Sequence, residues 1–154
     1  MKKIAVFPGS FDPITRGHES IVRRAVPLFD EIIVSIGINP EKKYLFTLEQ
    51  RLNWIKTVFK DLPNIHVEKY NGLTVDFCKS MNAGFILRGL RATTDFEFER
   101  SIAQMNKQLY PEIETIFFLA LSENIAINSS IVRNIYMGGG DITQFIPNGI
   151  NLNN

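Results

Sequence analysis

The stretch Phe7–His18 constrains the fold more than any other part of the chain. It reads Phe-Pro-Gly-Ser-Phe-Asp-Pro-Ile-Thr-Arg-Gly-His and follows the short apolar run Lys3–Phe7, which predicts a buried strand. Helical periodicity follows, so a strand leads through a Gly/Pro loop into a helix. Ser10, Thr15 and His18 supply polar groups at the start of that helix, where free N–H groups and the helix dipole favour an anion. The stretch therefore predicts a phosphate-binding loop.

The composition of the chain limits the remaining possibilities. A chain of 154 residues, with 45% hydrophobic and 21% charged side chains, predicts one globular domain that spans residues 1–154. The net charge of +1 supplies no field that would attract nucleic acid or a membrane surface. The single Cys78 cannot form an internal disulfide, and we expect neither a signal peptide nor a membrane helix. The expected location is the cytoplasm.

Strand and helix patterns alternate along the whole chain. Further strands are predicted at residues 31–37, 65–69, 85–87 and 116–119, and helices at about 17–26, from 48, at 73–81, from about 94 and at 129–137. Thr94 and Glu97 have capping-box spacing, and the helix after them carries an apolar stripe, whose Ile102 and Met105 are interpreted either as core or as walls of a ligand site. We expect the residues from Ile150 to be frayed. The pattern predicts an α/β fold, a Rossmann-like doubly wound parallel sheet of about five strands in the order 3-2-1-4-5.

Polar groups follow two other predicted strands. Arg88 and Arg91 come after the fourth strand, where guanidinium groups can hold phosphates with two hydrogen bonds each. Ser129 and Ser130 stand at the start of the last helix. Each feature also has an ordinary interpretation, as solvated surface arginines, a serine N-cap, or a solvated His18 in a Gly/Pro corner. In a sheet of this order the loop Gly9–His18 and the loop Arg88–Arg91 would face each other across the crevice where the strand order reverses.

The Thr-x-Gly-His motif at residues 15–18 resembles the nucleotidylyltransferase superfamily, whose motif histidine faces the α-phosphate of a nucleotide. The opening loop, Lys42, the block 88–99, the pair 105–106 and the segment 127–133 together resemble the phosphopantetheine adenylyltransferase family in order and spacing. The resemblance implies transfer of AMP from ATP to 4′-phosphopantetheine, with Mg²⁺ as cofactor, in the penultimate step of coenzyme A synthesis. It also implies a homohexamer.

The resemblance assigns roles to particular residues. The expected phosphopantetheine contacts are Ser10, Lys42, Thr74 and Arg88, with Ser10 also reaching ATP. The expected ATP contacts are Phe11, His18, Gly89, Leu90, Arg91, Glu99, Asn124, Ile125, Ala126, Ile127, Asn128, Ser129 and Ser130. Catalysis falls to His18, Lys42 and Arg91, and no protein residue is expected to ligate a metal. Asn124 and Asn128 replace the Trp and Ser that are common in the family, and Phe98 replaces a common Tyr while keeping its packing.

The expected mechanism needs no general base, because a phosphate oxygen is already anionic at neutral pH. Lys42 and Arg88 would hold the acceptor phosphate, His18 would donate to the α-phosphate, and Arg91 with the start of the last helix would hold pyrophosphate. Two alternatives remain open: another small nucleotidylyltransferase, acting on nicotinamide mononucleotide or a phosphorylated alcohol, and a non-catalytic nucleotide sensor. The block 88–99 and Lys42 favour the phosphopantetheine enzyme.

Overall fold

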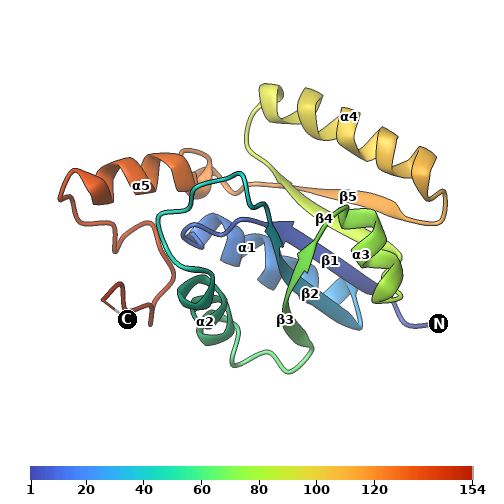
Figure 1. Cartoon of the computed structure of the whole chain (residues 1–154), viewed down its shortest axis with the longest axis horizontal. Helices are drawn as coiled ribbons and strands as arrows, with labels where there is room; N and C mark the ends of the chain where they lie inside the picture. The colour runs from blue at the N-terminus through green and yellow to red at the C-terminus, as the bar shows by residue number, and fades with distance from the viewer. Residues whose placement is uncertain (154) are drawn as a thin grey trace.

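Five parallel strands form a single sheet in the computed structural model, which describes residues 1–153 (Figure 1). The strands lie in the order β3-β2-β1-β4-β5. Their bounds are β1 Ile4–Gly9, β2 Glu31–Ile38, β3 Ile65–Asn71, β4 Phe85–Leu90 and β5 Glu114–Leu119. Every neighbouring pair is parallel. The predicted fold class and strand order are both confirmed.

Helices cover both faces of the sheet, as side-chain alternation along the strands requires. They are α1 Arg16–Ala25, α2 Leu48–Val58, α3 Thr74–Ser80, α4 Thr93–Leu109 and α5 Ser129–Met137, with short 3₁₀ turns at Val26–Leu28 and Ser122–Asn124. Phe7 and Val34 belong to the larger core, which α1 and α2 complete. Val6 and Ile33 point to the opposite face and pack with Val75 of α3. No helix within residues 1–153 combines the length and apolar content that a membrane crossing requires.

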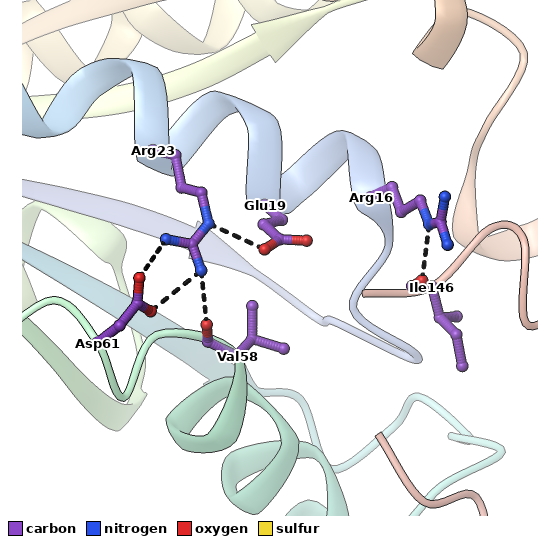
Figure 2. A network of polar contacts seen from close by, with 6 residues as sticks. All are labelled: Arg16, Glu19, Arg23, Val58, Asp61 and Ile146. Carbon is purple, nitrogen blue, oxygen red and sulfur yellow. Dashed lines mark hydrogen bonds and ion pairs between the residues drawn. The ribbon is translucent and has the colours of Figure 1, made fainter. Parts of the chain in front are cut away.

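Helix α1 is anchored at both ends by arginines (Figure 2). At its first residue, Arg16 donates from its backbone N–H to the Phe145 carbonyl and from Nε to the Ile146 carbonyl, both at 2.9 Å. Arg23, two turns later, donates to the carboxylates of Glu19 and Asp61 and to the carbonyl of Val58. The helix that carries His18 is thereby fixed against both α2 and the C-terminal segment.

Four local predictions are wrong. Strand β4 extends to Leu90, so Arg88 and Gly89 lie in the ladder opposite Phe117 and Phe118 instead of in a loop. The Thr94 capping box does not form, because α4 begins one residue earlier and the Asp95 carboxylate accepts from the N–H groups of residues 91 and 92.

The other two errors concern packing. Residues 150–152 are not frayed: Ile150 and Leu152 pack on the core, and Trp54 Nε1 donates to the Asn151 carbonyl at 3.2 Å. Asn154 lies outside the described residues. The stripe on α4 is not core, since Phe98 is 68% and Met105 58% exposed. Of the residues of α4, Glu99 is the one that is buried.

Candidate active site

A cavity of about 710 Å³ opens at the carboxyl ends of β1 and β4, where the strand order reverses. The loop after β1, the end of β4 and the start of α5 line it together. A second cavity of about 350 Å³ adjoins it and extends toward α3 and α4. The two share the lining residues Pro8, Gly9, Ser10, Arg88 and Glu99. The predicted crevice therefore exists, and it has two compartments.

The imidazole of His18 lies in the larger cavity as a neutral hydrogen-bond donor. Its Nδ1 accepts the backbone N–H of Thr15 at 3.0 Å, which assigns the ring proton to Nε2. Burial, assisted by the positive charges of Arg88 and Arg91, lowers the pKa of His18 to about 4. At neutral pH the ring thus offers an Nε2–H and carries no charge.

Phe11 supports this imidazole through an unusual backbone. Its ring meets that of His18 edge to face, with centroids 4.9 Å apart, and its φ of 47° lies in the left-handed region. Such a conformation costs a bulky residue about 1 kcal/mol or more. Gly9 makes the turn possible, because a Cβ there would lie 3.0 Å from the Phe11 ring.

The side chains of Lys42 and Ser10, both expected at the acceptor site, contact each other. Lys42 Nζ donates to Ser10 Oγ at 3.0 Å, although the two residues belong to the loops after β2 and β1. This contact places an ammonium group in the larger cavity next to the residues that both compartments share.

Arg88 is held rigidly between the compartments. Its Nε and Nη2 donate to the two oxygens of Glu99 at 2.8 and 2.6 Å, and its Nη1 donates to the Pro8 carbonyl at 2.9 Å. Side-chain exposure is 33% for Arg88 and 11% for Glu99. Glu99, an expected ATP contact, lines both cavities, and its carboxylate accepts two hydrogen bonds that orient the Arg88 guanidinium.

Arg91 lies at the mouth of the larger cavity, just beyond β4. Its Nε is 3.3 Å from Asp95 Oδ2, and its Nη1 donates to the Ile127 carbonyl at 3.4 Å. Both contacts are long, so the guanidinium keeps donors that can turn toward an anion in the cavity.

The start of α5 closes the opposite side of this cavity. Asn128, not a serine, is the N-cap, since its Oδ1 accepts the Ile131 N–H at 2.9 Å. Ser129 Oγ donates to the Pro13 carbonyl at 2.9 Å and so ties the helix to the first loop. The first two N–H groups of the helix, on Ser129 and Ser130, have no acceptor within the helix. They form the anion-ready end of α5.

The segment before α5 separates into lining and non-lining residues. Asn124 is buried and lines the cavity with Ile127 and Asn128. Ile125 and Ala126, also expected at the ATP site, are exposed and lie outside the lining, and Leu90 is buried in the fold instead. Asn124, one of the residues that depart from the family pattern, therefore lies in the wall of the larger cavity.

The smaller cavity contains Thr74, as expected for the acceptor side. Thr74 Oγ1 is 2.8 Å from the Tyr70 hydroxyl, and the Tyr70 ring stacks on Phe77 with centroids 4.6 Å apart. Ile102 and Asn106 of α4 form another wall of this cavity, whereas Met105 does not line it. Thr74 and Arg88 thus lie on the walls of the smaller compartment.

Sequence reasoning missed the role of Arg133. Its Nη1 donates to the Asp12 carbonyl at 2.8 Å, and its Nη2 donates to Ser130 Oγ at 3.1 Å, in the wall of the larger cavity. The signal was present in the sequence, because Arg133 lies one helical turn after Ser129 and Ser130 and therefore on the same face.

Comparison with known proteins yields consistent matches. The cytidylyltransferase-like family model matches residues 6–135. A phosphopantetheine adenylyltransferase of Flavobacterium psychrophilum is 53% identical over 96% of this chain and 97% of that protein. One from Christiangramia forsetii is 54% identical over 96% of both chains, and one from Lachnoclostridium phytofermentans is 48% identical over 96% of this chain and 91% of that protein.

Solved structures share the architecture at low identity. A bifunctional NMN adenylyltransferase/ADP ribose pyrophosphatase from Francisella tularensis aligns with a TM-score of 0.72 and 20% identity over 95% of this chain and 45% of that chain. A protein of Vibrio parahaemolyticus aligns with a TM-score of 0.71 and 18% identity over 97% of this chain and 90% of that chain. These likenesses show the fold.

Proposed function

The chain belongs to the phosphopantetheine adenylyltransferase family, and on that premise we propose that it transfers AMP from ATP to 4′-phosphopantetheine. The products are dephospho-coenzyme A and pyrophosphate, in the penultimate step of coenzyme A synthesis. Relatives that share about half of their residues with this chain over nearly its full length support this assignment.

The observation that carries the proposal is the pair of joined cavities. Adenylyl transfer needs a nucleotide site and an acceptor site that meet where the new bond forms. The two compartments meet at Ser10 and Arg88, and Lys42 lies beside this junction. The larger compartment suits ATP, and the smaller one, with the apolar wall from Ile102, suits the pantetheine arm.

The reaction is a single displacement at phosphorus. An oxygen of the acceptor phosphate attacks the α-phosphorus of ATP, the bond from that phosphorus to the bridging oxygen of the β-phosphate breaks, and pyrophosphate leaves with the electron pair. The attacking oxygen is anionic at neutral pH, so positioning and charge stabilisation replace a general base.

The chain's residues divide this work. Lys42 and Arg88 hold the acceptor phosphate, with Arg88 kept in place by Glu99. His18 Nε2–H donates to the α-phosphate as negative charge develops there, while Thr15 keeps the ring in the donor tautomer. Arg91 and the first N–H groups of α5 hold the departing pyrophosphate.

Mg²⁺ is the metal that we propose for this reaction. The acidic groups that line the larger cavity are already engaged, Glu99 by Arg88 and Asp95 by the backbone after β4. Within residues 1–153 no three potential ligands cluster into a cage. These residues fit a cation that would be ligated mainly by the ATP phosphates and water and would neutralise phosphate charge.

A homohexamer is our proposal for the assembly. An exposed apolar face runs along α4, formed by Phe98, Ile102, Met105 and Leu109. A contiguous apolar face of this kind on a single chain is typical of an interaction surface. Contact with further copies would bury it and would restore the packing that the sequence predicts for Phe98. For the location we propose the cytoplasm, in keeping with the buried free thiol of Cys78.

Pyrophosphate release from Mg-ATP with a panel of acceptors tests the proposed function. We expect turnover with 4′-phosphopantetheine and none with nicotinamide mononucleotide. Turnover with the mononucleotide alone would contradict the assigned acceptor, and no turnover with any acceptor that carries a phosphate would favour a nucleotide sensor. His18→Ala serves as the matched control, because it removes the donor to the α-phosphate.

A further inference from the structure

Two buried charged residues outside the mechanism lie between the loops that carry Ser10 and Lys42. Asp12 and Arg51 are each 3% exposed. A buried charge is costly unless hydrogen bonds satisfy it, so the partners of these two groups indicate what they hold.

Both side chains bind the same short segment. Asp12 accepts the N–H of Leu45 at 2.8 Å with Oδ2 and the N–H of Phe46 at 2.9 Å with Oδ1. Arg51 donates from Nε to the Phe46 carbonyl at 3.1 Å and from Nη1 to the Ser10 carbonyl at 2.8 Å. Four hydrogen bonds thus fasten residues 45–46 to the phosphate loop.

The fastened segment begins three residues after Lys42. The guanidinium of Arg51 also lies 4.1 Å from the centroid of the Tyr44 ring, so the residue directly before Leu45 is held as well. On the other side, Lys42 N–H donates to the Asn39 carbonyl at 3.2 Å and closes a turn. A lysine has a long flexible stem, and placing its ammonium group on Ser10 requires that the backbone beneath it be fixed.

We propose that Asp12 and Arg51 are positioning residues for the acceptor phosphate, acting through Lys42. They hold residues 44–46 against the first loop, and this keeps Lys42 Nζ at 3.0 Å from Ser10 Oγ. Neither residue lines the larger or the smaller cavity. The inference rests on the proposed adenylyl transfer, because it presumes that Lys42 binds an acceptor phosphate.

Steady-state kinetics of Asp12→Asn and Arg51→Met test the proposal. An asparagine at residue 12 can accept one of the two N–H groups but turns an amide N–H toward the other. We expect the KM for 4′-phosphopantetheine to rise about tenfold, as for loss of hydrogen bonds to a charged group, with the KM for ATP changed less than about twofold. Arg51→Lys should recover only part of the loss, since an ammonium cannot span both carbonyls.

The control is Arg23→Met, which removes from α1 an arginine that makes four hydrogen bonds away from Lys42 (Figure 2). It should lower the melting temperature and leave the acceptor KM unchanged. An acceptor KM that rose equally in Arg23→Met would show that the effect of Arg51→Met is general destabilisation, and would overturn the proposal.

A double-mutant cycle separates action through Lys42 from any other role. In the Lys42→Ala background, Asp12→Asn and Arg51→Met should raise the acceptor KM no further. The same fold-increase in both backgrounds would overturn the proposal. If the wild-type chain used another phosphate acceptor instead, the assigned substrate would be wrong, and the same cycle run with that acceptor would still decide the role of Asp12 and Arg51.

Hydrogen exchange gives a readout that is independent of turnover. Asp12→Asn should accelerate exchange of the Leu45 and Phe46 amides by about tenfold or more. The amide of Arg51, which donates to Thr47 at 3.1 Å within α2, is the internal reference and should not change. Unchanged exchange at residues 45 and 46 would overturn the proposal.

Discussion

Acidification should destabilise this protein through His18. The pKa of the imidazole falls from 6.5 to about 4 on folding, mainly because of burial. Between these two values the unfolded chain binds the proton and the folded chain does not, so the free energy of unfolding decreases as the pH falls from about 6.5 to about 4. At about 1.4 kcal/mol for each pKa unit, the loss reaches about 3 kcal/mol.

Urea unfolding of the wild type and of His18→Gln across this pH range measures that loss. The glutamine variant lacks the titrating group, so the wild type should lose about 3 kcal/mol more than the variant between pH 6.5 and pH 4. His66→Gln is the control, since it removes the other histidine of the chain, whose side chain is 50% exposed. Parallel pH profiles for wild type and His18→Gln would refute the lowered pKa of the His18 imidazole.

The same imidazole should govern the chemical step. His18→Ala should lower kcat by about 10²–10³, the typical cost of removing one donor to transition-state charge, with the Kd for ATP changed far less. NMR titration of the two histidines should show His18 neutral throughout the physiological range. Equal losses in ATP binding and in kcat would make His18 a ground-state ligand.

Three further predictions follow from the site. Lys42→Ala should weaken binding of 4′-phosphopantetheine and leave ATP binding intact, whereas Arg91→Ala should weaken ATP binding and leave acceptor binding intact. Arg91→Lys should restore little of the lost ATP affinity. Calorimetric titration with each ligand measures both affinities, and an equal loss of both ligands in both variants would show that the two cations act only as a shared positive field. Glu99→Gln should lower the free energy of unfolding by about 2 kcal/mol and weaken acceptor binding, because it leaves Arg88 without its charged partner. An unaltered acceptor affinity would show that Glu99 does not act on the acceptor site. Arg16→Met should lower kcat and change the KM for either substrate less, because it detaches the start of α1, which carries His18, from the C-terminal segment. An unchanged kcat would show that this anchor serves stability alone.

Patterns that depend on local physics were predictable from the sequence. The alternation of apolar strands with amphipathic helices indicated the sheet and its order, and the helix predicted from residue 48 begins at Leu48. The strand ends that carry His18 and Arg91 were identifiable from their residues, whereas Lys42 was assigned by the family resemblance; the structure brings all three into one cavity.

Features that depend on tertiary contacts were not predictable. The pairing of Glu99 with the Arg88 guanidinium could not be predicted from the motif position of Glu99 alone. The importance of Asp12 and Arg51 could not be predicted, because it comes from contacts between segments that are more than thirty residues apart in the sequence. The apolar stripe on α4 followed helical periodicity, but periodicity does not say whether the sheet or another molecule covers it.

The stereochemical course at the α-phosphorus tests the central claim most directly. With a chiral α-thio analogue of ATP and 4′-phosphopantetheine as acceptor, the configuration of the thio-substituted dephospho-coenzyme A reports how many displacements have occurred. A single displacement by the acceptor phosphate, held by Lys42 and Arg88, predicts inversion. Retention of configuration would require two displacements through a covalent intermediate on the protein, and would contradict the account.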